Sequence, residues 1–439
     1  MPGCSRRNAA LAPLLLVTLA FRAPAASGSE PNAPGRHATG DDGAGVVVAW
    51  NEVAFDVGHA EDQLRTFKTQ RAMAMAHLAM HDAVNAVMAR FAPYAFEASD
   101  PDADPVVAAA HAAHAVLVDQ YPGARARLDA VLAPWRARRA ADPAAARGAA
   151  VGERAAAAVL AARRDDGWDE PGSYAFASGP GAYQTTPPWD SFVLQPGFRH
   201  ARPFALRSAD QLRPPPPPPA GSAESAAALE EVRRQGARDG GERSADQSAY
   251  AVWWMEFAEG SVNRLARELV GRRGLGLAEA ARLFALLDVS LYDSYVATWD
   301  SKFEYGHWRP STAIHASASG VDPAAAAAAA AWEPMLPAPP FPEYVSAHAA
   351  GCASAFEVLR RVLGDGGAFA MRTTTAPAGM PERRFPDFST AAAECADSRV
   401  RLGWHFRYAT DAGLELGRAA ARWVVEHHLL PRRGSPEPP

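Results

Sequence analysis

Long alanine-rich segments with helical periodicity dominate this chain of 439 residues. Apolar positions recur every three to four residues in them, which places these positions on one face of an α-helix. Alternation of β-branched and polar residues with a period of two, which would predict strands, is scarce. The sequence therefore predicts an all-α protein built from antiparallel helical bundles. The expected helical segments are 71–86, 106–121, 124–139, 144–165, 223–236, 247–269, 277–302 and one that begins near 349.

The stretch from Gly167 to Pro219 interrupts this helical pattern. It is dense in glycine, proline and aromatic residues, and it ends in six prolines at 214–219. Such a run adopts an extended polyproline conformation and cannot continue a helix. The stretch could link two domains or lie as a long strap across one domain. We favour the strap, because its aromatic residues need a surface to pack on: Tyr183, Trp189, Phe192, Phe198 and Phe204.

The first 26 residues have the order of a secretory signal peptide. Arg6 and Arg7 precede an apolar run at 9–21, and small residues follow at 23–25. The arginine pair also resembles a twin-arginine export signal, although Asn8 replaces the usual apolar residue. We therefore expect an exported protein, periplasmic or secreted, with the general secretory and the twin-arginine routes as alternatives.

Composition limits what the remainder of the chain can do. Residues 27–45 lack periodicity and predict a flexible leader, and 46–430 are expected to form one helical domain. After the signal segment there is no apolar run of about 18 residues, the length that a membrane helix requires. The net charge of −5 and the lack of a basic stripe argue against nucleic-acid binding. Functional positive charge must therefore be local.

Two groups of residues could carry a cross-link or a metal. Cys4 leaves with the signal peptide, so Cys352 and Cys395 can either pair in an oxidising compartment or remain free buried thiols. Neither alternative indicates a zinc site. His77, His81 and Asp82 lie close together on one predicted helix, but on an alanine-rich helix such residues are more often packed and hydrogen-bonded than metal-bound.

Lys302 is one of only two lysines in a chain that otherwise uses arginine, and it stands seven residues before Arg309-Pro310. The pair combines a compact ammonium with a forked guanidinium. A spacing of seven residues is about two helical turns. It predicts that both side chains project from one face of a long helix ending near Pro310.

Two later segments complete a cationic constellation. Ser346-Ala347-His348 directly precedes an evident helix, so it should lie where free N–H groups and the helix dipole favour an anion. Arg399 and His405 follow, six residues apart. Together with Lys302 and Arg309, these residues predict a pocket for a tetrahedral oxyanion.

This series, Lys302-x6-Arg309-Pro310, Ser346-x-His348 and Arg399-x5-His405, resembles the signature shared by vanadium-dependent haloperoxidases and type 2 phosphatidic acid phosphatases. Segments 71–86 and 293–314 and the strap are similar in texture to the bacterial haloperoxidase-like branch. The resemblance covers most of residues 45–425. It implies two packed helical bundles of the four-helix type in one domain.

The resemblance also implies vanadate as cofactor and a role for each residue of the signature. His405 would bind vanadium through a ring nitrogen, and His348 would act as acid–base on the opposite side. The vanadate oxygens would be neutralised by three cations, Lys302, Arg309 and Arg399. Hydrogen bonds to these oxygens would come from Ser346 and the backbone N–H of Ala347. Vanadate is a multiply charged oxyanion, so surrounding cations and donors suit it. The implied reaction oxidises halide with hydrogen peroxide to a hypohalous acid equivalent, which then meets a small organic acceptor.

Trp299 and Phe341 match the aromatic residues on the halide side of chloroperoxidase-type pockets. Ordinary core packing is the alternative for both of them. The choice between chloride and bromide stays open.

Three positions depart from the family pattern. Ala347 stands where glycine is usual, and Val345 where proline is usual. Ala409 stands where an aspartate commonly orients the last histidine, and Asp411 follows two residues later. If Asp411 cannot reach His405, a backbone carbonyl has to fix the tautomer of this histidine.

Two other functions use the same residues. An exported soluble acid phosphatase would attack phosphorus with His405 and protonate the leaving alcohol with His348, through a phosphohistidine intermediate. A non-catalytic helical protein could retain the anion pocket alone. Because both need the same cations as a haloperoxidase, the signature by itself does not separate them.

Overall fold

The computed structural model describes residues 43–63, 67–137, 141–319, 321–365 and 367–432. The predicted signal peptide and nearly all of the predicted leader lie outside these residues. The last two leader positions, Ala44 and Gly45, already belong to the first helix.

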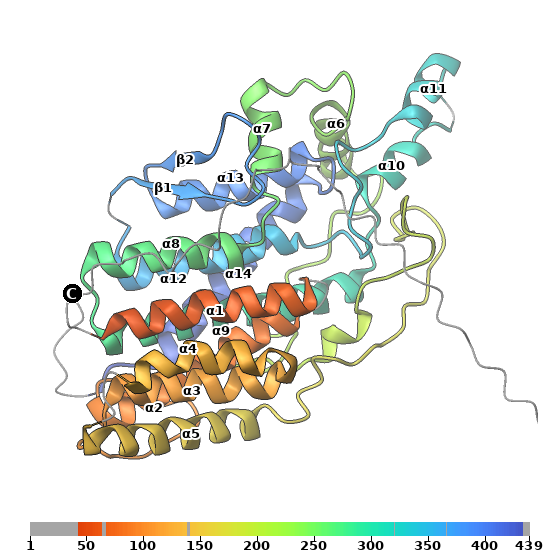
Figure 1. Ribbon diagram of the computed structural model, residues 1–439. Coiled ribbons are helices and arrows are strands. Elements are labelled where there is room, and N and C mark those ends of the chain that lie inside the picture. Colours follow the sequence, from red (N-terminus) through yellow and green to blue (C-terminus); the bar gives the residue numbers. More distant parts are fainter. Residues whose placement is uncertain (1–42, 64–66, 138–140, 320, 366, 433–439) are drawn as a thin grey trace, which may run out of the picture. The chain divides into compact units, whose positions relative to one another are not determined.

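The described residues form fourteen α-helices, two short 3-10 helices and one two-stranded antiparallel sheet (Figure 1). The all-α prediction is thus confirmed, apart from a small hairpin near the C-terminus that the sequence pattern did not indicate. The elements are α1 (Ala44–Asp62), α2 (Lys68–Met88), α3 (Pro105–Gln120), η1 (Pro122–Ala124), α4 (Arg125–Ala137), α5 (Pro143–Ala162), η2 (Pro196–His200), α6 (Ala223–Gln235), α7 (Ala245–Trp253), α8 (Ala258–Arg273), α9 (Leu277–Tyr305), α10 (Pro310–Ala316), α11 (Pro323–Ala331), α12 (Ala347–Leu363), β1 (Phe369–Arg372), β2 (Glu382–Phe385), α13 (Phe388–Arg401) and α14 (Arg407–His427).

Three of these helices begin at an Asp-Pro pair. Asp104, Asp142 and Asp322 are the N-cap residues of α3, α5 and α11, and each side chain accepts a backbone N–H of the first turn. The proline that follows takes the first helical position, where its missing N–H is no loss. Local sequence therefore sets these three helix starts.

The helices pack as two groups on either side of α9. Figure 1 shows α1 to α5 in one group and α8, α12, α13 and α14 in the other. Helix α9 contacts α1 and α2 in the first group and α8, α12 and α14 in the second. Its residues 277–303 are almost all buried, as expected for a helix that is covered on every side. Lys302 belongs to this buried part of α9, so its side chain starts in the protein interior.

The predicted helix at 247–269 is two helices, which corrects the sequence-based boundary. α7 ends at Trp253, and α8 begins at Ala258. In the break, Glu256 donates its backbone N–H to Thr375 Oγ1, and its carboxylate binds Arg264 and the N–H of Thr374. Hydrogen bonds to residues far along the chain replace the backbone hydrogen bonds of a helix here. The sequence has no glycine or proline at residues 254–257 that would have marked the break.

The prediction that Lys302 and Arg309 share one helix face is wrong. Helix α9 ends at Tyr305, because Gly306 takes a left-handed conformation with φ of 51°, which glycine adopts without strain. Arg309 is extended and forms the N-cap of α10, with Pro310 at the first helical position. The two cations are therefore brought together by tertiary contacts instead of by helical spacing.

The stretch 167–219 lies across the helices as a strap. The backbone N–H of Tyr183 donates to Gly306 O, and that of Leu194 donates to Pro340 O. Buried Asp293 of α9 accepts the three consecutive N–H groups of residues 204–206. These contacts hold the strap along its length, as its aromatic residues predict.

Helices α12 and α14 approach closely at two glycines of α14. A Cβ atom placed on Gly413 would lie 2.6 Å from Ser346 O, and one on Gly417 would lie 2.1 Å from Ala350 O. Real side chains do not reach such distances, so glycine is required at both positions. This close packing holds the N-terminus of α12, where Ser346 lies.

The two cysteines and the polar residues of α2 have structural partners. Cys352 and Cys395 form a disulfide. His77 pairs with Asp288, His81 lies 3.0 Å from Ala92 O, and Asp82 accepts three backbone N–H groups. Within the described residues, no group of three or more histidine, cysteine or acidic side chains is placed to hold a metal ion. Among the helices of this part of the chain, none is both long and apolar enough to cross a membrane.

Candidate oxyanion site

The loop of residues 339–346 gathers most of the predicted site residues. Lys302 Nζ donates to Pro342 O and Glu343 O at 2.8 and 3.0 Å. Arg309 donates to Phe341 O and Pro339 O at 3.0 and 3.2 Å. Both cations are fully buried. Backbone carbonyls of one loop therefore hold two charges that come from different elements.

The ring of Phe341 lies against both cations. Its centroid is 4.9 Å from Lys302 Nζ and 5.0 Å from the guanidinium carbon of Arg309. A cation attracts the electron-rich face of an aromatic ring. Burial lowers the pKa of Arg309 to about 10, and burial together with Arg309 lowers the pKa of Lys302 well below its ordinary value. An anion at this site would offset that unfavourable crowding of positive charge.

Glu343 orients the imidazole of His405. The Nδ1 atom of His405 is 2.9 Å from Glu343 Oε1, and Nε2 is 3.3 Å from Nη1 of Arg309. A guanidinium only donates hydrogen bonds. Nε2 is therefore the unprotonated nitrogen, and Nδ1 donates to Glu343. Neither Asp411 nor a backbone carbonyl fixes this tautomer, contrary to the alternatives that the sequence suggested.

The electrostatics of the site keep His405 neutral. Burial lowers its pKa well below the ordinary value, and Arg309, Lys302, Arg399 and His348 lower it further. These four side chains thus lie within electrostatic reach of one imidazole. Burial also raises the pKa of Glu343 to about 8, although Arg309 and Lys302 act against this rise.

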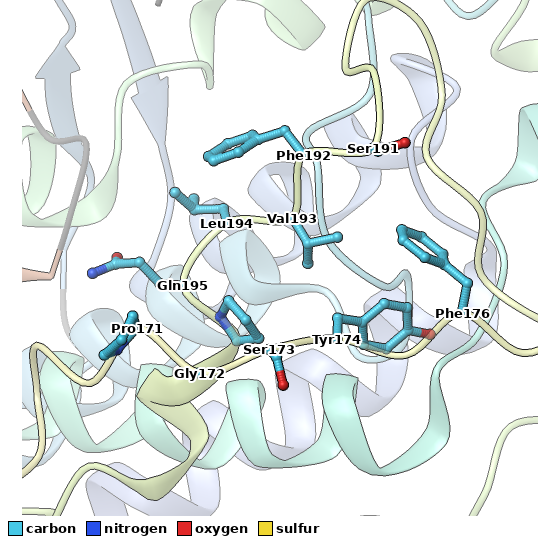
Figure 2. A pocket seen from close by; sticks show the side chains of 11 residues that line it. Pro171, Gly172, Ser173, Tyr174, Phe176, Ser191, Phe192, Val193, Leu194 and Gln195 are labelled. Carbon is cyan, nitrogen blue, oxygen red and sulfur yellow. The ribbon is translucent and has the colours of Figure 1, made fainter. Parts of the chain in front are cut away.

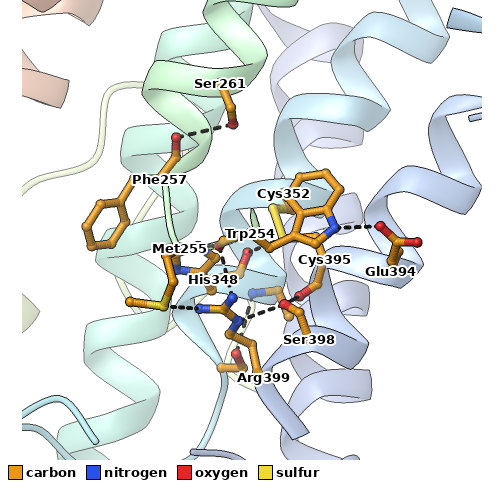
Figure 3. Close-up of a disulfide and its surroundings, with 12 residues drawn as sticks. Trp254, Met255, Phe257, Ser261, His348, Cys352, Glu394, Cys395, Ser398 and Arg399 are labelled. Atoms are coloured by element: carbon orange, nitrogen blue, oxygen red, sulfur yellow. Dashed lines mark hydrogen bonds between the residues drawn. A yellow bond between two sulfur atoms is a disulfide. The ribbon is translucent and has the colours of Figure 1, made fainter. Parts of the chain in front are cut away.

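Arg399 and His348 meet at the carbonyl of Trp254 (Figure 3). Arg399 Nη2 donates to Trp254 O at 2.9 Å, and His348 Nε2 lies 2.8 Å from the same oxygen. Trp254 follows the last residue of α7, so the guanidinium lies at the negative end of that helix. Burial lowers the pKa of Arg399 to about 9, and burial followed by Arg399 lowers the pKa of His348 well below its ordinary value.

Ser346 and Ala347 lie at the start of α12, as predicted. Ser346 is the N-cap residue, its oxygen accepts the N–H of Ala349, and its own N–H donates to Ala409 O at 3.0 Å. The Ser346 hydroxyl proton and the first N–H groups of the helix, beginning with Ala347, have no acceptor inside the helix. Ala409, at the position where the family usually has an aspartate, thus contributes its backbone carbonyl, which holds the N–H of Ser346.

Two buried donors near the cations have no hydrogen-bond partner among the described residues. They are the Tyr183 hydroxyl of the strap and Nε1 of Trp299 on α9. Burial raises the pKa of Tyr183 to about 12, opposed by the nearby guanidinium of Arg309. The ring of Trp299 lies 4.9 Å from that of Phe341, and it also packs on Phe67. Trp299 therefore packs in the core through its ring, while its unpartnered Nε1 stays able to donate to a ligand.

A groove of about 470 Å³ opens in the strap beside this loop (Figure 2). Its lining carries no charged side chain. Tyr174 and Phe176 form one wall, and Val193 points toward them from the returning segment. Leu194, in the same segment, donates its backbone N–H to Pro340 O. The groove is thus joined by backbone to the loop that holds Lys302 and Arg309.

Comparison with known proteins points to one family. Residues 282–433 match the family described as the VCPO second helical-bundle domain. This range contains the whole predicted signature. The vanadium chloroperoxidase of Curvularia inaequalis is 29% identical over 141 residues, which cover 27% of this chain and 23% of that enzyme. In its C-terminal part the chain thus matches the vanadium haloperoxidase superfamily.

Solved structures show the same fold over most of the chain. A bacterial vanadium-dependent iodoperoxidase has a TM-score of 0.74 at 24% identity, covering 88% of this chain and 97% of that one. A holo-type bacterial vanadium-dependent chloroperoxidase has a TM-score of 0.66 at 17% identity, covering 81% and 90%. At these identities the likeness establishes the fold. The sequence match to the curated chloroperoxidase takes in less than a quarter of that enzyme's length.

The residues of the site fit a tetrahedral oxyanion such as vanadate. Buried Lys302 and Arg309 are held by one loop, and Arg309 contacts the imidazole of His405, whose Nε2 is free of a proton. The same loop leads into the N-terminus of α12. Vanadate needs an unprotonated nitrogen ligand, and its oxygens need cations and donors. The chemistry of the donors thus matches the group that the family name implies.

Sequence reasoning missed four contributors to the site. Glu343 stands between Phe341 and Ser346, which the sequence had both indicated, so its neighbourhood was a usable signal. Trp254 acts through its carbonyl, and Trp404 both accepts from Arg309 and lies with its ring 5.3 Å from the guanidinium carbon of Arg399. Tyr183 comes from the strap. No local pattern could have indicated these last three.

Proposed function

We propose that this chain is a vanadate-dependent haloperoxidase that oxidises halide with hydrogen peroxide to a hypohalous acid equivalent. One observation carries the proposal. Glu343 holds His405 with Nε2 free of a proton, and buried Lys302, Arg309 and Arg399 act electrostatically on this imidazole. A site built to bind only a small neutral molecule has no use for this concentration of buried positive charge.

The residues that would hold vanadate are those of the signature. His405 would ligate vanadium through Nε2, the three cations would neutralise the vanadate oxygens, and Ser346 and the N–H of Ala347 would donate hydrogen bonds to them. Bound vanadate would supply a Lewis acid that makes peroxide electrophilic without a change of oxidation state. The protein supplies charge, orientation and proton transfer.

His348 is proposed to move a proton at one specific atom, Nδ1. Its Nε2 donates to Trp254 O, so Nδ1 carries the lone pair. Burial and Arg399 hold its pKa well below the ordinary value, and the imidazole is neutral at neutral pH. Nδ1 can therefore accept a proton from incoming peroxide and return it when the hypohalous acid equivalent leaves.

The remaining partners follow from the surroundings of the site. Trp299 and Phe341 are proposed to line the halide side, where the unpartnered indole N–H of Trp299 and the cations behind Phe341 would attract a small anion. The small organic acceptor is proposed to enter through the groove of Figure 2, whose uncharged lining suits a neutral molecule.

Purified protein loaded with vanadate, then given hydrogen peroxide and bromide, tests the activity through bromination of a phenol-red indicator. We expect bromination that requires vanadate and that His405→Ala abolishes. Metal-free protein is assayed in parallel with a phosphomonoester. Hydrolysis that vanadate inhibits, without any bromination, would establish the acid phosphatase instead. Tight vanadate binding with neither activity would identify a non-catalytic anion-binding protein.

We also propose that the mature protein is exported, on the basis of the signal-like order of residues 1–26. The Cys352–Cys395 disulfide supports this, because disulfides persist in oxidising compartments. Mass spectrometry of the protein from cell fractions should find an N-terminus near residue 27 outside the cytoplasm. An intact N-terminus in the cytoplasmic fraction would contradict export.

A further inference from the structure

The disulfide lies one helical turn from two residues of the site. Cys352 of α12 follows His348 by four residues, and Cys395 of α13 precedes Arg399 by four residues. Residues four apart lie above one another on the same face of a helix. The cross-link thus joins the faces of α12 and α13 that carry the proposed acid–base and one of the three cations.

His348 and Arg399 share one hydrogen-bond acceptor, the carbonyl of Trp254, and the side chain of Trp254 is hydrogen-bonded to α13. Trp254 O accepts from Arg399 and from His348, and the Trp254 indole donates to Glu394, the neighbour of Cys395, at 2.9 Å. Figure 3 shows these side chains gathered around the disulfide. The Sγ of Cys395 lies 3.8 Å from the carbonyl oxygen of His348. The disulfide therefore contacts the backbone of one site residue directly.

Arg399 is held in place by uncharged partners that belong to this arrangement. The hydrogen-bond partners found for it are Ser398 Oγ, Met255 Sδ and the carbonyls of Ala251 and Trp254. Among the ion pairs of the described residues, none joins Arg399 to a carboxylate. Carbonyl dipoles hold a charge only at short range and in the right direction. A shift of α13 against α12 would therefore change the position of the guanidinium.

We propose that the Cys352–Cys395 disulfide is a positioning element of the oxyanion site, which holds His348 and Arg399 side by side on the carbonyl of Trp254. The inference rests on the site proposed above and names a part of it that lies outside the signature. Opening the disulfide lets α13 move relative to α12. The anion then meets a misplaced cation and is bound more weakly.

Anion affinity in the full chain tests this role. Calorimetry with inorganic phosphate compares the wild type with the double variant Cys352→Ala/Cys395→Ala, at a temperature where circular dichroism shows both folded. We expect the double variant to bind phosphate at least fivefold more weakly. Val358→Ala, which removes fully buried side-chain volume from the same helix, is the matched control and should bind within twofold of the wild type.

A second readout separates positioning from general loosening. The pKa of His348, followed by NMR of labelled imidazole, should rise in the double variant, because the ring gains solvent and loses the nearby guanidinium. It should not move in Val358→Ala. If the double variant does not fold, the wild type is reduced, its thiols are capped and the reductant is removed before the same two measurements.

Unchanged phosphate affinity in protein that is folded and free of the disulfide would overturn the positioning role. An equal loss in Val358→Ala would do the same, since stability alone would then explain it. If the wild type binds neither phosphate nor vanadate, the oxyanion site itself fails. If it binds both regardless of the disulfide, only the positioning role fails.

Discussion

Glu343 lies 2.9 Å from Nδ1 of His405 through its Oε1 atom, although 62 residues separate the two in the chain. The carboxylate takes over the task that the family usually gives to an aspartate at the position of Ala409. It comes from the loop that also holds Lys302 and Arg309. Orientation of the His405 imidazole and placement of two cations therefore depend on one segment.

Glu343→Ala should weaken vanadate binding. Loss of a partner behind a metal-binding histidine typically lowers affinity by about 10- to 100-fold, and here the variant also frees Nδ1 to take the wrong tautomer. Equilibrium dialysis with vanadate measures the effect. Asp411→Ala is the matched control, because Asp411 does not contact His405, and it should bind as the wild type does. Equal losses in both variants would contradict the assignment of Glu343.

Tyr183→Phe should weaken anion binding without lowering stability. The hydroxyl is buried with no partner among the described residues, so its removal leaves nothing unpaired in the protein. A hydrogen bond to a charged group contributes about 1.5–3 kcal/mol, which predicts a loss of roughly tenfold or more in phosphate affinity by calorimetry. Tyr292→Phe removes another buried unpartnered hydroxyl, near Asp166 and Arg163, and serves as control. Its affinity should not change.

The buried His81 of α2 should make stability depend on pH. Burial lowers its pKa from 6.5 to about 4, so the unfolded chain takes up a proton between these values and the folded protein does not. The contribution is complete above pH 6.5 and is lost as pH falls toward 4, a change of about 3 kcal/mol. Urea unfolding at pH 7 and pH 4 compares the wild type with His81→Gln. The stability deficit of the variant should shrink at pH 4, and a constant deficit would show that His81 does not titrate in this way.

Gly417→Ala should destabilise the protein, since its Cβ would lie 2.1 Å from Ala350 O on α12. Overpacking of this kind typically costs about 1–3 kcal/mol. Gly271→Ala is the matched control, because a Cβ there would meet nothing within 4 Å. It should raise stability by up to about 1 kcal/mol, as alanine favours the helix. Chemical denaturation of both variants measures the difference, and a neutral Gly417→Ala would show that α12 and α14 can separate without loss.

The helices and their starts could be read from the sequence to a large extent. Periodic apolar positions and the Asp-Pro pairs act through neighbouring residues, so the pattern of 105–120 or 143–162 is visible without the fold. The break between α7 and α8 could not be read, because Glu256 is held by Thr374 and Thr375, over a hundred residues away.

The sequence by itself determined the helical class, the strap and the identity of the charged residues around the site. Only the tertiary structure decided how those residues meet: Arg309 leaves the helix of Lys302, Glu343 reaches His405, and Cys352 pairs with Cys395. Helix signals are local, because each backbone bond spans four residues. Burial of charge is not local, since the carbonyls and carboxylates that stabilise a buried cation come from wherever packing places them.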